Sequence, residues 1–266
     1  MRALTGTQPD PSADAFFAGD YRPNWSPDQY SLAFVTNFAW RQPFPNPGGW
    51  DVVNVLDLAT MTVHPLGPGD WPTWSRDGRL AWSRRDSNGG PAGFVLDGHV
   101  FTGRRWKPSW SPDGRMVVYE QLLRGGWAVV VMHSDGGTSR RIGWGRDPRW
   151  SPDVRWIASW RAGGLELISP DGRRVRRAAL SVGAGDETDW PVWSPNSKYV
   201  TVGLTIFTLG TGKEHEMPVG QAGVTTPSWS PDSRWLVYGN IQTPLQLVRP
   251  DGTGRHDVNP CATTTP

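Results

Sequence analysis

Cysteine, lysine and long apolar runs are scarce in this chain of 266 residues. The single cysteine, Cys261, excludes an intramolecular disulfide and leaves the redox compartment open. No stretch approaches the roughly 18 apolar residues of a membrane-spanning helix, so we expect no membrane span. The first 20 residues lack the apolar segment of a secretory signal peptide. Lysine occurs only at positions 107, 198 and 213, and a net charge of +2 is too small to demand a nucleic-acid partner.

Motifs that carry common chemistry are also missing. The sequence has no Gly-x-Ser-x-Gly nucleophile motif and no glycine-rich phosphate loop followed by a helix. No His-x-x-x-His or Cys-x-x-Cys unit occurs. The five histidines are expected on or near outer hairpins, at positions 64, 99, 133, 215 and 256. We therefore predict no catalytic residue, no metal and no cofactor.

One acidic connection keeps an enzymatic alternative open. Asp186, Glu187 and Asp189 lie close together in it. Paired carboxylates can serve glycosidase chemistry. A solvated acidic loop is the simpler interpretation of the same three residues.

Glycine, proline and tryptophan are abundant, with 32, 25 and 17 residues, and a repeated phrase explains much of this. Its core is Pro-x-Trp-Ser, followed by a turn that contains Asp or Asn and then by an apolar run. Six copies begin at Pro23, Pro72, Pro108, Pro148, Pro191 and Pro227. Their tryptophans are 49, 36, 40, 43 and 36 residues apart. A period of about 40–45 residues is typical of propeller blades.

Each repeat is expected to form four antiparallel strands, A to D in chain order. In the third repeat these are residues 107–111, 115–120, 127–133 and 138–143. Asp-Gly pairs, which strongly favour hairpins, follow strand C at positions 97, 135, 171 and 251. We predict an all-β, six-bladed propeller over residues 21–258. Residues 1–20 would form an N-terminal segment, with residues 2–5 pairing with the last blade, and residues 259–266 would form a tail.

The residues of the repeated phrase each have a physical role. Proline in Ser-Pro-Asp presets the first central position of a tight turn, and the Asp side chain can bond the backbone two residues on. The proline before the tryptophan cannot donate to a central strand, so strand A should be an edge strand at a channel. The phrase tryptophans are expected to be wedges between blades, with an aromatic ring around the channel as the alternative.

The phrase "PSWSPDGRMVVY" and its copies resemble the WD-like repeat of TolB-like six-bladed propellers. This resemblance covers roughly residues 21–258. It implies a fold shared by periplasmic scaffold and translocation proteins, gating propellers of prolyl-oligopeptidase-type enzymes and some polysaccharide lyases. It also suggests a periplasmic or other extracytoplasmic location. The chain departs from TolB itself by lacking its extra N-terminal domain, and it lacks the histidine-rich metal site of pectate-type lyases.

The predicted site lies on the face that carries the B–C and D–A connections. These connections vary in length and carry many Trp and Arg residues, the types enriched at binding hot spots. The candidate ligand-binding residues are Trp71, Arg105, Trp106, Lys107, Arg146, Asp189 and Trp190. We expect Trp106 and Trp190 to be exposed at the channel mouth, although these tryptophans could instead fold back over the blades.

The leading functional hypothesis is a monomeric, non-enzymatic binding module. Its partner would be a protein or peptide, with a glycan as the alternative ligand. A carbohydrate-active lyase or hydrolase using the same face is one rival hypothesis. The propeller domain of a larger envelope or signalling protein is another.

Overall fold

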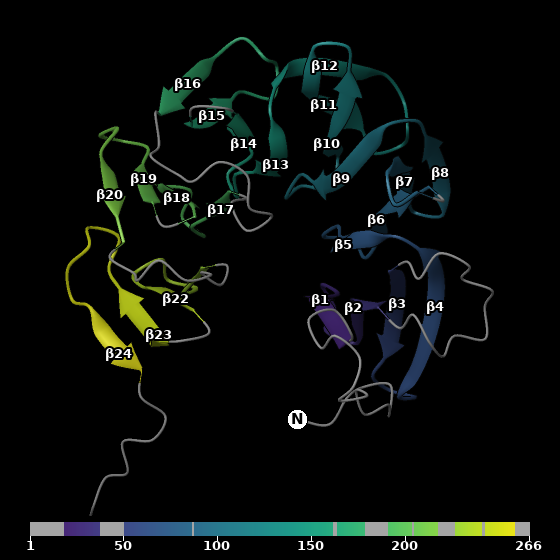
Figure 1. Ribbon diagram of the computed structural model, residues 1–266, viewed down its shortest axis with the longest axis horizontal. Coiled ribbons are helices and arrows are strands. Elements are labelled where there is room, and N and C mark those ends of the chain that lie inside the picture. Colours follow the sequence, from purple (N-terminus) through teal and green to yellow (C-terminus); the bar gives the residue numbers. More distant parts are fainter. Residues whose placement is uncertain are drawn as a thin grey trace, which may run out of the picture. The chain divides into compact units, whose positions relative to one another are not determined.

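A computed structural model of the chain describes residues 19–37, 51–86, 88–161, 164–178, 191–203, 205–217, 227–240 and 243–258. Its 24 strands form six sheets of four strands each (Figure 1). We call these sheets blades 1 to 6 and keep the letters A to D for their strands. Within the described ranges, no helix is long and apolar enough to cross a membrane.

Strands in every blade follow chain order from A to D. The strands of blades 1 to 3 are β1 (Gly19–Trp25), β2 (Ser31–Asn37), β3 (Val52–Asp57), β4 (Thr62–Pro68), β5 (Asp70–Trp74), β6 (Leu80–Arg85), β7 (Pro91–Leu96), β8 (His99–Thr102), β9 (Arg105–Trp110), β10 (Met116–Leu123), β11 (Gly126–His133) and β12 (Ser139–Trp144). The strands of blades 4 to 6 are β13 (Arg146–Trp150), β14 (Ile157–Arg161), β15 (Gly164–Ile168), β16 (Val175–Ala178), β17 (Val192–Trp193), β18 (Tyr199–Val202), β19 (Thr205–Thr208), β20 (Glu214–Glu216), β21 (Ser228–Trp229), β22 (Leu236–Asn240), β23 (Thr243–Val248) and β24 (His256–Val258).

The predicted six-bladed propeller with four antiparallel strands per blade is confirmed. Each phrase tryptophan ends a strand A, and each following turn leads into a strand B. Strand β1 begins at Gly19 and β24 ends at Val258. The predicted pairing of residues 2–5 with the last blade lies outside the described residues.

The chain divides into two compact units. The first comprises Met1–Gly125 and Met132–Ser139, and the second comprises Gly126–Val131 and Arg140–Pro266. Blades 1 and 2 belong to the first unit and blades 4 to 6 to the second, while the strands of blade 3 are divided between them.

The inner strands B and C are buried on both faces, as their continuous apolar runs predict. In β10, the consecutive residues Val117, Val118 and Tyr119 have no exposed surface. Because successive side chains of a strand point to opposite faces, consecutive burial means that both faces are covered.

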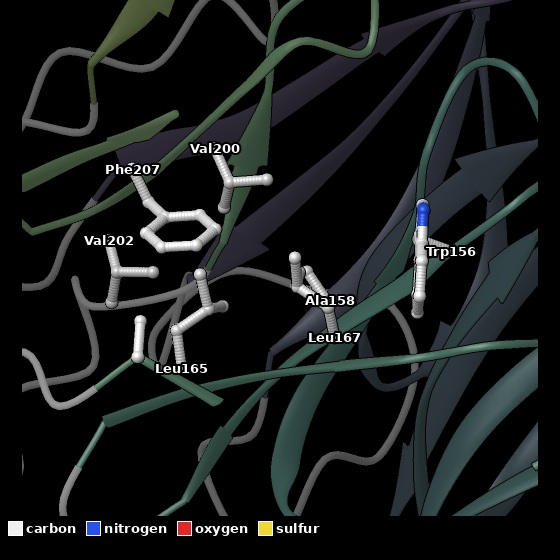
Figure 2. Packing of buried hydrophobic residues seen from close by; sticks show 8 residues of the cluster. Trp156, Ala158, Leu165, Leu167, Val200, Val202 and Phe207 are labelled. Carbon is white, nitrogen blue, oxygen red and sulfur yellow. The ribbon is translucent and has the colours of Figure 1, made fainter. Parts of the chain in front are cut away.

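Apolar side chains of neighbouring blades form the core of the second unit (Figure 2). Val200, Val202 and Phe207 come from β18 and β19 of blade 5, and they pack with Leu165 and Leu167 from β15 of blade 4. Full burial of one such side chain stabilises the fold by about 1.5–3 kcal/mol. This packing holds blade 4 to blade 5.

The Ser-Pro-Asp turn between strands A and B caps itself, as predicted. In blade 3, Ser111 Oγ donates to Asp113 Oδ1 at 2.6 Å and accepts the Met116 N–H at 2.9 Å. The hydrogen bond from Ser111 lowers the pKa of Asp113 below its ordinary value. The other five copies contain the same Ser-to-Asp or Ser-to-Asn bond. The polar residues of the phrase therefore build turns.

Three of the phrase tryptophans bond to the blade before their own, as wedges between blades would. The indole N–H of Trp74 donates to the Asn24 carbonyl of blade 1 at 3.0 Å. Equivalent bonds join Trp110 to Thr73 at 3.2 Å and Trp193 to Arg149 at 3.0 Å. Trp25 differs from the prediction, since 57% of it is exposed.

Candidate functional site

The residue before the phrase proline has an unusual backbone in the four blades where it is described. Its φ is 55° at Arg22, 55° at Trp71, 50° at Lys107 and 53° at Asp147. This left-handed conformation costs a non-glycine residue roughly 1–2 kcal/mol. A cost that recurs at this place in all four described repeats needs a structural or functional reason.

A β-bulge in strand A accounts for this conformation. The pairing of β5 with β6 shifts register between Asp70 and Thr73, which brackets Trp71 and the phrase proline. Strands A of blades 1, 3 and 4 shift at the same place. A bulge accommodates proline because the missing N–H falls outside the regular ladder. It also re-aims the neighbouring side chain, and bulges are frequent beside functional sites.

Two cations lie against the indole of Trp71. The guanidinium carbon of Arg22 is 3.5 Å from the ring centroid, and Lys107 Nζ is 4.5 Å from it. These three residues occupy the same bulge position in blades 1, 2 and 3. Such contacts contribute about 0.5–1 kcal/mol each at exposed sites and about 2 kcal/mol when desolvated. Trp71 itself is only half-buried.

Asp70 is fully buried directly before Trp71. Its Oδ2 lies 2.5 Å from Arg85 Nη2 and 3.6 Å from Arg22 Nη1. Asp51 Oδ2 lies 3.8 Å from the same Arg85 nitrogen. Burial raises the pKa of Asp70 to about 6, because the loss of hydration outweighs the attraction of the two guanidinium groups. We call Arg22, Asp51, Asp70, Trp71, Arg85 and Lys107 the Trp71 cluster.

The expectation that Trp106 is exposed is wrong. Only 6% of Trp106 is exposed, and the Arg85 guanidinium carbon lies 5.1 Å from its ring centroid. The residue belongs to β9, where it pairs with the fully buried Glu120 of β10. It therefore lies inside the blade, with its ring against Arg85 of the Trp71 cluster.

Two other predicted residues of this region are described. Lys107 was predicted to begin strand A of this repeat, and it lies within β9, where it is only 5% exposed. Its backbone N–H donates to Ser83 Oγ at 2.9 Å. Arg105 is half-buried, with its guanidinium carbon 5.7 Å from the Tyr119 ring centroid. The structure thus brings Trp71, Trp106 and Lys107 into one connected group, with Arg105 at the adjacent position of β9.

The remaining predicted residues are Arg146, Asp189 and Trp190, and the structure does not test whether they join this group. Arg146 belongs to the second unit, where it is exposed with its guanidinium carbon 5.2 Å from the Trp127 ring centroid. Asp189 and Trp190 lie outside the described residues, as do the acidic residues 186 and 187. A binding role for these residues stays a prediction.

Our sequence-based site omitted Arg22, Asp51, Asp70 and Arg85. A usable signal for Arg22 was present, since alignment of the repeats on the phrase proline places it in the same column as Trp71 and Lys107. The pairing of Asp70 with Arg85 carries no such signal, because it depends on the register of β5 against β6.

The histidines lie toward the outer strands, as predicted. His64, His99, His215 and His256 belong to strands D, and His133 ends a strand C. In the part of the chain that the structure describes, no three His, Cys, Asp or Glu side chains are grouped as a metal site would require.

No family profile matches this sequence, and no curated protein matches it. Solved structures with the same fold do match. TolB from Acinetobacter baumannii superposes with a TM-score of 0.51 at 18% identity, over 90% of this chain and 53% of TolB. This chain therefore corresponds to about half the length of that protein.

Two further structures extend the comparison. Hydrazine synthase of Kuenenia stuttgartiensis gives a TM-score of 0.63 at 16% identity, over 92% of this chain and 81% of that chain. An oligogalacturonate lyase in complex with manganese gives 0.56 at 16% identity, over 90% and 76%. At these identities the likeness establishes the fold alone, a six-bladed β-propeller with TolB-like structural neighbours.

Proposed function

We propose that this chain is a non-enzymatic binding module that recognises a protein or peptide at the Trp71 cluster. The cluster lies where strands A of blades 1 to 3 begin, on the side of the B–C and D–A connections. Function concentrates on such connections because a rigid scaffold holds them while their sequences vary.

Trp71 is the single observation that carries this proposal. It is a large aromatic residue in a costly backbone conformation, half-buried, with Arg22 and Lys107 against its ring. The phrase tryptophans do not adopt this left-handed backbone, although Trp110 also has a guanidinium, that of Arg79, 4.6 Å from its ring centroid. Tryptophan and arginine in desolvated surroundings are the usual anchors of protein interfaces.

The ion pairs next to Trp71 hold this anchor residue in place. Asp70 holds Arg85 and Arg22, and Arg22 in turn lies on the indole. A pre-ordered anchor loses little conformational entropy when a partner binds. This favours recognition of a defined protein or peptide segment, with a glycan stacked on the indole as the alternative ligand.

The test is a screen of the immobilised full chain against a displayed peptide library and a glycan array, followed by affinity measurements on Trp71→Ala. Loss of a hot-spot tryptophan should weaken binding by about 2 kcal/mol, or roughly thirtyfold. Trp235→Ala is the matched control. Trp235 is also half-buried and lies 5.2 Å from an arginine, Arg249, but it belongs to blade 6.

Each outcome of this screen is informative. A selected peptide that loses affinity with Trp71→Ala, but not with the control, supports the proposal. Equal affinity for wild type and Trp71→Ala would move the site elsewhere. If the array selects glycans and the library selects no peptide, the ligand is a glycan and not a protein or peptide.

A carbohydrate-active enzyme remains the second candidate because of one carboxyl pair. Asp70 has a pKa raised to about 6 and shares Arg85 with Asp51, and enzymes shift carboxyl groups in this way for acid catalysis. Against this role, Asp70 is fully buried and cannot touch a substrate in this conformation. Turnover of an oligosaccharide that disappears in Asp70→Asn and Asp51→Asn would establish the enzyme and refute the binding module.

A further inference from the structure

The outer strand of blade 4 carries an exposed run of arginines. The segment Arg173-Arg174-Val175-Arg176-Arg177 leads into and forms most of β16, and all five residues are exposed. Strand β16 comes last in the order β13-β14-β15-β16 (Figure 1), so no described strand pairs with its outer edge. Alternate residues of such an edge direct their N–H and C=O groups outward.

The neighbouring outer strand, β12, adds two more arginines. Arg140 donates from Nη1 to the Asp171 carbonyl at 2.8 Å and from Nη2 to the Pro170 carbonyl at 3.0 Å. These bonds hold β12 beside the turn that precedes β16, within the second unit. We call Arg140, Arg141, Arg173, Arg174, Arg176 and Arg177 the arginine face.

Neutral groups hold several of these guanidinium groups in place. Arg174 and Arg176 lie 5.1 and 5.0 Å from the centroid of the buried Trp156 ring. Arg176 also donates to the Leu209 carbonyl at 3.2 Å, and Arg141 lies 4.7 Å from the Trp144 centroid.

Among the described residues, Glu166 and Asp171 are the carboxylates that form ion pairs with the arginine face. Glu166 lies 2.8 Å from Arg177 and 3.3 Å from Arg161, which lies outside the face. Asp171 lies 3.9 Å from Arg173. In the described part of the chain, Arg141, Arg174 and Arg176 form no ion pair. Their positive charge is therefore available to an anionic partner.

We propose that an acidic, extended segment of a partner protein adds to the outer edge of β16 as a fifth strand of blade 4. Strand addition uses the outward backbone groups for affinity and alternate side chains for specificity. Residues two apart in a strand are about 6.6 Å apart, so acidic side chains at every second position would face Arg174 and Arg176 together.

Two features favour a peptide strand over a nucleic acid. Val175 is 45% exposed between the arginines and offers an apolar cross-strand contact. Single-stranded nucleic acids instead need open aromatic faces for stacking. The ring of Trp156 is only 7% exposed, so the arginine face offers no such ring there.

Charge on this edge also determines which strands it rejects. Charged side chains on edge strands prevent association with neutral or like-charged strands. The outer strand of blade 5, β20, carries Glu214 and Glu216 and would repel the same acidic segment. Specificity for blade 4 follows from this difference. The arginine face belongs to the second unit and the Trp71 cluster to the first, so the proposal does not depend on the function proposed above.

The test uses the full chain and a fluorescein-labelled decapeptide in which glutamate alternates with threonine around one central valine. Fluorescence anisotropy at low ionic strength should show saturable binding that weakens with added salt. Arg174→Gln with Arg176→Gln keeps two long side chains and removes two charges, and it should weaken binding about tenfold. Arg155→Gln with Arg234→Gln is the control, because it removes two exposed charges of the same unit outside the arginine face.

A second arm tests strand addition itself. The same peptide N-methylated at alternate residues keeps its charge but loses backbone donors on one edge, and binding should be lost. Equal binding of the methylated peptide would reduce the interaction to charge attraction and overturn the proposal. Absence of peptide binding, or tight binding of an oligothymidine in its place, would overturn it as well.

Discussion

Replacement of Trp106 and of Trp71 by alanine should separate a structural tryptophan from a binding one. Only 6% of the Trp106 surface is exposed, and the residue lies within β9. Truncation of a buried tryptophan to alanine costs about 3–5 kcal/mol. Loss of the contact with Arg85 adds about 0.5–1 kcal/mol. Because domains are stable by only about 5–15 kcal/mol, Trp106→Ala should be severely destabilised.

Trp71→Ala should behave differently, since its ring is half-buried and its main contacts are with two cations. Two such contacts sum to about 1–2 kcal/mol. Trp71→Gly loses the same contacts but relieves the left-handed backbone at φ 55°, which returns about 1 kcal/mol. The glycine variant should therefore lie within about 1 kcal/mol of wild type.

Urea denaturation followed by far-ultraviolet circular dichroism measures all three variants without any ligand. The expected order of stability is wild type, then Trp71→Gly, then Trp71→Ala, with Trp106→Ala far below. Equal losses for Trp71→Ala and Trp106→Ala would show that Trp71 belongs to the core. The proposed binding site would then lose its main support.

Three further predictions concern the parts around this site. The pKa of Asp70 is higher in the folded chain, at about 6, than its ordinary 3.8, so the folded state binds the extra proton between these values. The stability of wild type relative to Asp70→Asn should therefore fall by about 3 kcal/mol as pH rises from about 4 to about 6, and level off above. Urea denaturation at several pH values in this range measures this change in stability. A rise in stability instead of a fall would mean that the attraction of Arg85 and Arg22 for the Asp70 carboxylate outweighs its loss of hydration. Trp110→Phe keeps a ring but leaves the Thr73 carbonyl without its indole donor, so it should cost about 1–2 kcal/mol; unchanged stability in urea would show that this bond does not anchor the wedge. Ser111→Ala removes the acceptor of the Met116 N–H and should cost about 1–2 kcal/mol. In the same variant the pKa of Asp113 should rise toward its ordinary value in an NMR titration, and a constant pKa would contradict the self-capping turn.

The propeller could be predicted from the sequence because its blades repeat. Each copy of the phrase combines a turn with self-capping chemistry, a buried strand and an Asp-Gly or equivalent hairpin, and six copies agree with one another. Local preferences and the global fold then point to the same answer. Trp71 and Lys107 were selected because they lie in or beside connections rich in Trp and Arg, and both also precede a phrase proline.

The burial of individual site residues depended on tertiary structure. Trp106 follows two arginines and precedes a lysine, and this polar setting suggested exposure. The structure instead places it inside blade 3 opposite the buried Glu120. A single residue of register in a strand exchanges its two faces, so sequence neighbours say little about which side chain is covered.

Sequence alone determined the number of blades, their strands and the chemistry of their turns, because these depend on residues close together in the chain. Only the tertiary structure decided that Arg22, Asp70 and Arg85 meet around Trp71, and that Arg140 lies beside Asp171 next to a strand edge with which no described strand pairs. These contacts join different blades, or the start of one strand and the end of its antiparallel neighbour. Their geometry follows from bulges, register and blade packing, which act over distances that no local pattern encodes.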